Sequence, residues 1–298
     1  MQNSKLQFKI QNFSEDDLKK LYIPPPNSHK GQNGKLMVIG GSKLFHAASL
    51  WSLKVASRIV DMVFYSSIPE NNQIVMEAKK EFRDGIVIPR AKIENYIKEA
   101  DCVLIGPGLP RADGQEKGDD DTKELTESLL KKYPSKKWVI DGGSLQVINP
   151  SLIPYNAILT PHFREFEKLF NFKFQISNFK SNSNDKIIKI QKKVGEMAKK
   201  YDCTVLLKGP TDIICDKARC VRVSGGNAGM TKGGTGDVLA GLVAGLYCKN
   251  DDPFLVASCA SYINKKAGES LFKKVGYYFS ASDLVDEIPR VMKELIIR

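Results

Sequence analysis

A glycine-rich segment from Ser224 to Asp237 has the composition of an anion-binding loop. Gly233, Gly234 and Gly236 lack the Cβ atoms that would keep a ligand away from the main chain. A strongly apolar stretch typical of a buried helix follows at once, so the free N–H groups and the dipole of its first turn would favour a phosphate. A Walker P-loop is excluded, because no Gly-Lys-Ser or Gly-Lys-Thr follows these glycines.

Asp237 would lie in the first turn of that helix, beside the expected anion site. A carboxylate at this position can simply complement the helix dipole. It can also act as a base that takes a proton from a hydroxyl group, while the helix N–H groups hold a transferring phosphoryl group. The residue pattern alone leaves both interpretations open.

Short β-branched runs alternate with helical stretches along the chain, and these elements must position the loop. Most runs end in a polar, glycine-rich or proline-rich turn, which predicts an α/β fold with a mainly parallel sheet covered on both faces. Ligands of such sheets bind beyond the carboxyl ends of the strands, where these turns would gather. The expected strands are Lys35–Ile39, Met62–Tyr65, Cys102–Ile105, Trp138–Ile140, Ala157–Leu159 and Thr204–Leu207, with a helix over about 47–60.

The 298 residues, of which 42% are hydrophobic and 27% charged, suit one large α/β domain, and we expect a single domain over 1–298. Two polar stretches, 113–121 and 177–185, are predicted to be solvated, mobile surface loops without a catalytic role. No apolar run approaches the roughly 18 residues of a membrane span, and the first residues lack the pattern of a signal peptide. We therefore expect a cytoplasmic protein with no membrane partner.

Six cysteines are present without any Cys-x-x-Cys pair, and several lie inside apolar runs. This pattern predicts buried or half-buried free thiols in a reducing cytoplasm. The three histidines, His29, His46 and His162, are far from the cysteines in sequence. We therefore predict no metal site.

Lysine and arginine number 45 against 34 acidic residues, which gives a net charge of +11. Such a surplus suits nucleic acid, anionic lipid or a phosphorylated small substrate. The densest basic stretch, 186–200, has apolar residues at helical spacing, which favours a solvated helix face over a nucleic-acid groove. No interleaved aromatic stretch supports a nucleic-acid partner, and we expect none.

The run Gly-Gly-Thr-Gly-Asp-Val-Leu-Ala-Gly at 233–241, after Gly226-Asn227 and Gly229-Met230, resembles the hallmark of the ADP/ATP-dependent NAD(P)H-hydrate dehydratases of the ribokinase-like superfamily. The likeness continues in order over most of the chain. The other matching segments are His29-Lys30-Gly31, Gly40-Gly41-Ser42, Ile105-Gly106-Pro107-Gly108-Leu109, Ile158-Leu159-Thr160-Pro161-His162 with Glu165, Leu207-Lys208-Gly209, and Ser280-Ala-Ser-Asp-Leu284 with Ile288-Pro289.

The resemblance implies a ribokinase-like three-layer αβα sandwich with a central, mainly parallel sheet. It also implies an enzyme that dehydrates (S)-NAD(P)H hydrate back to NAD(P)H as metabolite repair. The hydrate's hydroxyl group would be phosphorylated, and phosphate would then leave as the ring nitrogen's lone pair drives elimination. ADP or ATP would be the co-substrate, with Mg2+ on its phosphates and few dedicated protein ligands. The sequence distinguishes neither the two donors nor the two hydrates.

The same resemblance assigns the site residues. Asp237 would be the catalytic acid/base, and with Ala48, Gly108 and His162 it would face the hydrated nicotinamide. Lys208 after a strand offers a point charge to phosphate, and His162 on a loop can donate to a ligand oxygen. The residues implied for the nucleotide are Lys208, Gly209, Pro210, Thr211, Asp212, Gly233, Gly234, Thr235 and Gly236.

The chain also departs from the family pattern. Ala228 stands where proline is usual, and Lys232 stands where a small or hydroxyl residue is common. A second acid, common at position 143, is replaced by Gly143, and the glycine usual before Ala48 is missing.

Two alternatives remain. A ribokinase-like vitamin-precursor kinase would use the same base but release a phosphorylated product; thiazole-type kinases generally have Cys at the position of Asp237. A non-catalytic nucleotide-binding protein of the same fold is the other alternative. Family members commonly form tetramers, so a homo-oligomer is expected. Because one domain takes up nearly all of the chain, we expect any NAD(P)H-hydrate epimerase partner to be a separate protein.

Overall fold

The protein is described here by a computed structural model that covers residues 9–111, 114–174 and 183–297. The strands are β1 (Lys9–Asn12), β2 (Lys35–Ile39), β3 (Met62–Ser66), β4 (Ile86–Val87), β5 (Cys102–Ile105), β6 (Lys137–Ile140), β7 (Ile158–Leu159), β8 (Thr204–Leu207), β9 (Asp212–Cys215) and β10 (Arg219–Val223). The α-helices are α1 (His46–Ala56), α2 (Pro69–Ala78), α3 (Ile93–Glu99), α4 (Thr122–Lys132), α5 (Gly142–Val147), α6 (Phe163–Leu169), α7 (Ser183–Lys200), α8 (Thr235–Tyr247), α9 (Pro253–Val275) and α10 (Ala281–Ile296). Short 3-10 helices are η1 (Glu15–Lys20), η2 (Arg90–Lys92), η3 (Pro150–Leu152) and η5 (Ala228–Thr231).

The strands form one sheet in the order β1-β10-β9-β8-β7-β6-β5-β2-β3-β4. Neighbouring strands are parallel, except that β9 runs antiparallel to both β8 and β10. The six strands expected from the sequence are present at nearly the expected bounds. The predicted mainly parallel sheet is therefore confirmed.

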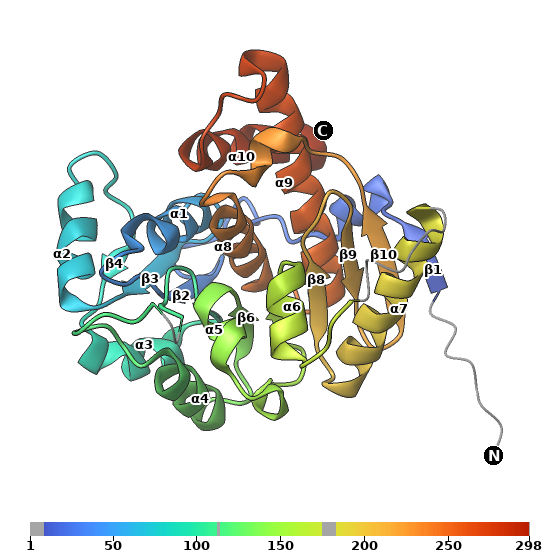
Figure 1. Ribbon diagram of the computed structural model, residues 1–298. Coiled ribbons are helices and arrows are strands. Elements are labelled where there is room, and N and C mark those ends of the chain that lie inside the picture. Colours follow the sequence, from blue (N-terminus) through green and yellow to red (C-terminus); the bar gives the residue numbers. More distant parts are fainter. Residues whose placement is uncertain (1–8, 112–113, 175–182, 298) are drawn as a thin grey trace.

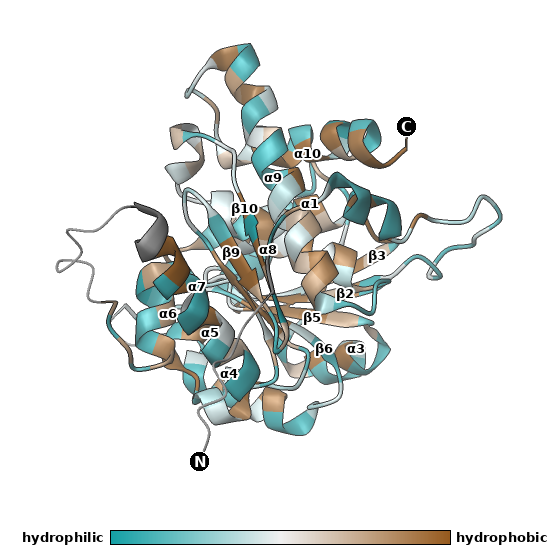
Figure 2. Cartoon of the chain, turned by 90° about the vertical axis from the view of Figure 1, so that its right-hand side faces the viewer, coloured by the Kyte–Doolittle hydropathy of each residue, from teal (hydrophilic) through white to brown (hydrophobic). Residues whose placement is uncertain are grey.

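Helices cover both faces of this sheet, as Figure 1 shows. α1, α8, α9 and α10 pack on one face, and α3 to α7 pack on the other. Successive residues of β2 alternate between the two cores, with Leu36 and Val38 on the first side and Met37 and Ile39 on the second. In Figure 2 the apolar residues accordingly concentrate on the strands and on the inner sides of the helices. The three-layer arrangement is the one predicted.

The antiparallel pair β9 and β10 corrects one expectation. The register places Cys215 directly opposite Cys220, and the two form a disulfide across the hairpin. The prediction that all cysteines are free thiols is therefore wrong for this pair, because five positions of separation bring both side chains to one face of a hairpin. Cys102, Cys203, Cys248 and Cys259 are free and buried, as expected.

The structure describes most of the first predicted polar loop, 113–121, but only the end of the second, 177–185. Residue 113 and residues 177–182 lie outside the described part of the chain, and 183–185 are already helical in α7. In the remainder of the first stretch, Asp119 accepts a hydrogen bond from the Lys43 amide, and Asp120 pairs with Arg90 at 2.5 Å. Asp119 and Asp120 are therefore tied to the fold, whereas residues 115–118 are exposed as predicted. Within the described ranges no helix is long and apolar enough to cross a bilayer.

The segments that follow β2, β5, β6, β7 and β8 meet at one edge of the sheet, because these strands are parallel neighbours. Backbone hydrogen bonds hold adjacent turns together there. The Gly41 amide donates to Pro107 O at 2.8 Å, the Asp141 amide to Ile105 O at 3.0 Å, and the Lys208 amide to Pro161 O at 2.8 Å. This edge carries most of the polar residues singled out by the sequence.

Candidate active site

An ion pair between Asp141 and Lys208 lies at the centre of this edge. The Asp141 Oδ1 atom accepts hydrogen bonds from Lys208 Nζ at 2.9 Å and from Thr160 Oγ1 at 2.7 Å. Asp141 is buried and Lys208 is largely buried. Burial disfavours the charged ammonium, but the nearby carboxyl groups, led by Asp141, outweigh it and raise the pKa of Lys208. Lys208 is therefore a fixed positive charge.

Asp237 lies beside this pair, in the first turn of α8. Burial is the main cause that raises its pKa to about 7, and the Asp141 carboxylate adds to the effect. The Lys208 ammonium acts in the opposite direction. A carboxyl group with this pKa gains and loses a proton near neutral pH, as a general acid or base requires.

His162 and Glu165 form a reciprocal cap at the start of α6. The Glu165 amide donates to His162 Nδ1 at 3.2 Å, and the His162 amide donates to Glu165 Oε2 at 2.9 Å. Burial, with the charge of Lys208, lowers the pKa of His162, so its ring is neutral at pH 7. Because Nδ1 accepts, the ring proton is on Nε2, which lies 3.5 Å from Glu165 Oε1 and can donate to a ligand.

The start of α8 brings the glycine-rich loop to the ion pair. Gly234 has the left-handed φ of 95°, and a Cβ there would lie 2.3 Å from the Trp51 ring. A Cβ on Gly236 would lie 3.3 Å from Lys208 Nζ, which places the ammonium next to the helix N-terminus. The free N–H groups of this first turn and the ammonium together form a site suited to a phosphoryl group.

A cavity of about 780 Å3 opens beside these residues. Seven of the predicted site residues line it: His162, Lys208, Gly209, Pro210, Asp212, Thr235 and Gly236. The rest of its wall comes from the loop 225–231 and from Leu239, Asn264 and Lys265. This volume accommodates a nucleotide-sized ligand.

Asp212 stabilises the turn after β8 by hydrogen bonds within the protein. Its Oδ1 atom accepts from the Gly209 amide at 2.8 Å, and its Oδ2 atom accepts from Ser261 Oγ at 2.7 Å. Lys265 Nζ lies 3.4 Å from Oδ1 and also donates to Gly209 O at 3.1 Å. Burial raises the pKa of Asp212, and the Lys265 ammonium opposes that effect. The carboxyl oxygens bond within the protein, so a nucleotide contact through Asp212 stays a prediction.

The remaining predicted residues lie around this centre. A Cβ on Gly108 would lie 3.0 Å from the Ala48 Cβ, so these two are neighbours. Ser52, one turn after Ala48, donates to Asp237 O at 2.7 Å, which fixes α1 against the start of α8. Ala48, Gly108 and Asp237 are thus grouped on the α1 side, whereas His162 is in the cavity wall. Gly233 is exposed, and Thr211 Oγ1 lies 3.3 Å from Ser224 Oγ.

Two departures from the family pattern have packing causes. A Cβ on Gly143 would lie 2.2 Å from Leu109 O, so the turn after β5 occupies the space that a side chain there would need. The Lys232 ammonium donates to Tyr277 O and to Phe279 O, and thereby ties the glycine-rich loop to the connection between α9 and α10. Both changes leave the Asp141–Lys208 pair and Asp237 in place.

Sequence reasoning missed Asn264 and Lys265, which reach the cavity from the middle of α9. Both are buried, at about 5% exposed. The available signal was the polar run Asn264-Lys265-Lys266, which directly follows the mainly apolar stretch 253–263. Glu165 also joins the centre: burial, followed by the Asp141 carboxylate, raises its pKa against the effect of Lys208.

Within the described ranges, no group of three or more His, Cys, Asp or Glu side chains is arranged to hold a metal ion. The most central carboxylate, Asp141, already accepts from Lys208 and Thr160. We derive no step through a protein-bound ion.

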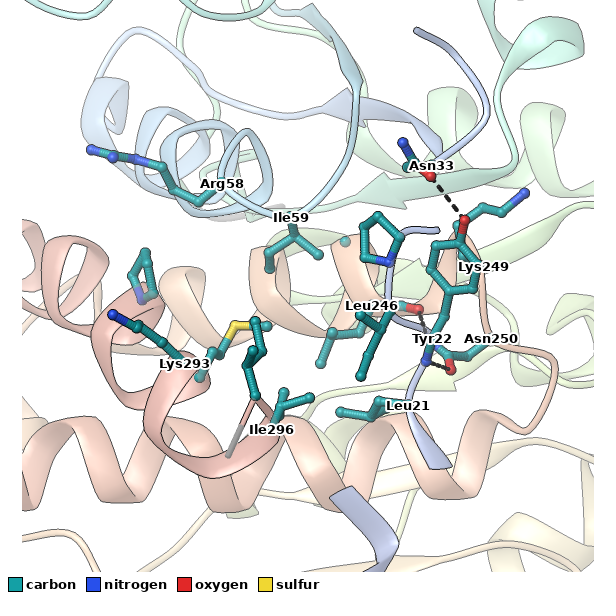
Figure 3. A pocket seen from close by; sticks show the side chains of 16 residues that line it. Leu21, Tyr22, Asn33, Arg58, Ile59, Leu246, Lys249, Asn250, Lys293 and Ile296 are labelled. Atoms are coloured by element: carbon teal, nitrogen blue, oxygen red, sulfur yellow. Dashed lines mark hydrogen bonds between the residues drawn. The ribbon is translucent and has the colours of Figure 1, made fainter. Parts of the chain in front are cut away.

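A second cavity, of about 220 Å3, lies where α8 ends (Figure 3). Figure 3 shows Leu21, Leu246 and Ile296 around it, with Arg58, Lys249 and Lys293 nearby and the Tyr22 hydroxyl directed at Asn33. The described residues that line it include no carboxyl or imidazole group. The carboxyl group whose pKa is raised to about 7, Asp237, lies instead at the start of α8, so the candidate active site is the cavity there.

Comparison with known proteins gives a consistent result. A family profile for NAD(P)H-hydrate dehydratases matches residues 36–290. The chain is 36% identical over 290 residues to the ADP-dependent (S)-NAD(P)H-hydrate dehydratase of Nitrosopumilus maritimus, covering 93% of this chain and 95% of that protein. It is also 36% identical over 288 residues to the bifunctional NAD(P)H-hydrate repair enzyme of Methanocaldococcus jannaschii. That match covers 93% of this chain, which spans about half (52%) of the relative.

Solved structures confirm the ribokinase-like fold. A ribokinase-like superfamily protein of Enterococcus faecalis matches with a TM-score of 0.75 at 21% identity, covering 99% of this chain and all of that one. The ADP/ATP-dependent NAD(P)H-hydrate dehydratase of Bacillus subtilis, crystallised with ATP and Mg2+, also gives a TM-score of 0.75 at 21% identity, covering 96% of this chain and 99% of that one. At such identities the likeness concerns the fold.

Proposed function

The chain belongs to the NAD(P)H-hydrate dehydratase family, and we propose that it restores NAD(P)H from (S)-NAD(P)H hydrate by consuming a nucleotide. The observation that carries the proposal is Asp237, whose pKa is raised to about 7 next to the Lys208 charge and a helix N-terminus. The relatives of known name supply the substrate class. Because two of them are named ADP-dependent, we propose ADP as the phosphoryl donor.

In this proposal, Asp237 takes the proton of the hydrate's hydroxyl group as the oxygen attacks the terminal phosphorus of the nucleotide. The P–O bond to AMP breaks, and Lys208 with the first N–H groups of α8 stabilises the charge on the transferring group. The C–O bond then breaks with phosphate as the leaving group, driven by the ring nitrogen's lone pair. Loss of a ring proton gives NAD(P)H, so one AMP and one phosphate form per dinucleotide restored.

The predicted assignments of Ala48, Gly108 and His162 to the hydrate, and of 208–212 and 233–236 to the nucleotide, are part of this proposal. The neutral His162 ring, with its proton on Nε2, suits donation to a ligand oxygen. Mg2+ would travel on the nucleotide phosphates, where the ion usually keeps several waters.

The proposal is tested with the purified protein, NADH hydrate, Mg2+ and either ADP or ATP, by following the near-ultraviolet absorbance of NADH. We expect NADH, AMP and phosphate to form in equal amounts from ADP. A stable phosphorylated product without NADH would instead identify a kinase. Nucleotide binding without any turnover would identify a non-catalytic nucleotide-binding protein.

Further properties concern the compartment and the assembly. Four buried free cysteines suit a reducing cytoplasm, whereas the Cys215–Cys220 disulfide is unusual there. We propose a cytoplasmic homo-oligomer, a tetramer by family resemblance, and a single domain over 1–298. We also propose that a hydrate epimerase acts together with this enzyme; gel filtration with light scattering tests the assembly.

A further inference from the structure

We propose that Asn264 binds the adenine of the nucleotide through its carboxamide, by accepting from the exocyclic amino group and donating to the adjacent ring nitrogen. This inference rests on the proposed function, because it assumes that the cavity beside Lys208 holds a nucleotide. Nothing in the family resemblance used above assigns a role to this position.

The first observation is that the Asn264 carboxamide has no partner. The residue is only about 5% exposed, and its Oδ1 atom is buried without a hydrogen bond. No hydrogen bond of Nδ2 is present either within the described ranges. A buried polar group in this state costs the folded protein stability unless something binds it. The side chain also lines the nucleotide cavity, so a ligand can supply the hydrogen-bond partners that the carboxamide lacks.

Asn227 is a useful contrast, because it lines the same cavity and both polar atoms of its carboxamide are hydrogen-bonded within the protein. Its Nδ2 atom donates to Gly268 O at 2.7 Å, and its Oδ1 atom accepts from the Gly229 amide at 2.9 Å. Asn227 therefore shapes the loop, whereas the Asn264 carboxamide is left for a ligand.

Neighbouring contacts fix Asn264 relative to the phosphate end of the cavity. Lys265, the next residue, donates to Gly209 O at 3.1 Å and Pro210 O at 3.2 Å, and so binds α9 to the turn that carries Lys208. One turn further along α9, Glu269 accepts from the Gly226 amide at 3.1 Å. Asn264 thus lies on the α9 face held between the two loops that enclose the cavity.

A carboxamide is the side chain whose donor and acceptor match the edge of adenine, where an amino group adjoins a ring nitrogen. Rotation about the terminal χ2 angle of asparagine is soft, so either end of the amide can turn to the cavity. The phosphates would lie at Lys208 and the start of α8, with the base at the α9 wall. Adenine nucleotides are the ligand class that fits both ends.

The test is isothermal titration of the full chain with ADP, with purine riboside 5′-diphosphate, which lacks the amino group, and with 2′-deoxy-ADP. Wild type should bind ADP at least about tenfold more tightly than the purine analogue, because the analogue leaves the buried acceptor unpaired. Asn264→Leu should weaken the binding of ADP and abolish the difference in affinity between ADP and the purine analogue. In Asn227→Leu, the affinities for ADP and for the purine analogue should fall by the same factor.

Thermal unfolding without nucleotide separates binding from a structural role. Asn264→Leu should unfold at the wild-type temperature or above it, since it removes an unsatisfied group, whereas Asn227→Leu should unfold earlier. If Leu does not fit, Asn264→Ala serves the same titration.

Equal binding of ADP and the purine analogue by wild type would overturn the inference and leave the proposed function standing. A loss of affinity for 2′-deoxy-ADP that Asn264→Leu abolishes, without discrimination at the base, would also overturn it and assign Asn264 to the ribose. Failure of wild type to bind any of the three would overturn this inference and the proposed function together.

Discussion

The Asp141 carboxylate raises the pKa of Asp237 by charge repulsion, and both carboxyl groups also interact with the Lys208 ammonium. Asp141 has two effects: it holds Lys208 by a 2.9 Å hydrogen bond, and it raises the pKa of Asp237. Activity that depends on ionised Asp237 should therefore rise with pH and level off above about pH 7.

Asp141→Asn should move this rise to lower pH. The substitution removes the negative charge that raises the pKa of Asp237 and frees Lys208 to lower it further. The measurement is kcat/KM against pH for both proteins. Asp286→Asn removes a surface carboxylate that pairs with Arg58 and serves as the control, with no displacement expected. An unchanged profile in Asp141→Asn would show that Asp237 is not the group observed.

Asp237 should also make the protein less stable as pH rises. Its pKa is raised from 3.8 to about 7 in the folded state, so the stability present below about pH 4 is lost as pH rises to about 7. Asp237→Asn carries no such charge and should gain up to ~4 kcal/mol relative to wild type over this window, at ~1.4 kcal/mol per pK unit. Denaturant unfolding at pH 4 and pH 8 measures the gain. A difference that is independent of pH would contradict the raised pKa.

Among the elements, the start of α8 depends on glycine more strictly at Gly234 than at Gly233. A Cβ on Gly234 would meet the Trp51 ring at 2.3 Å and Ala281 at 2.8 Å, and its φ of 95° disfavours any other residue. Gly234→Ala should lower the free energy of unfolding by ~2 kcal/mol or more. Gly233, with nothing within 4 Å of a Cβ, is the matched control, and Gly233→Ala should change stability by less than ~1 kcal/mol. Equal losses in denaturant unfolding would mean that the loop is not packed as described.

The central strands could be predicted because both of their faces are buried, which gives continuous apolar runs that end in recognisable turns. The pairing of β9 with β10 was missed, because Arg219 and Arg222 interrupt the apolar run of β10. Lys208, His162 and Asp237 could be located because they follow strands or begin a helix. Asn264 and Lys265 could not, because their place at the cavity depends on how α9 packs against the turn after β8.

At the scale of the whole molecule, the four free cysteines report on folding because all are buried. Burial raises the pKa of Cys203 to about 12 and also raises the pKa values of Cys248 and Cys259, which makes their thiolates scarce. The native protein at pH 8 should show almost no reactive thiol with a chromogenic disulfide reagent. Unfolded without reductant it should show four, and after reduction six. Six without reduction would contradict the Cys215–Cys220 bond.

The central claim is that this fold brings Asp237 to a nucleotide and a hydrated dinucleotide as their general base. The most direct test compares wild type with Asp237→Asn in the regeneration of NADH from its hydrate with ADP and Mg2+, while ADP affinity is measured in parallel. We expect turnover by wild type and a loss of at least about a hundredfold in kcat for Asp237→Asn, with ADP affinity within a few-fold. Turnover by Asp237→Asn at the wild-type rate would contradict the account.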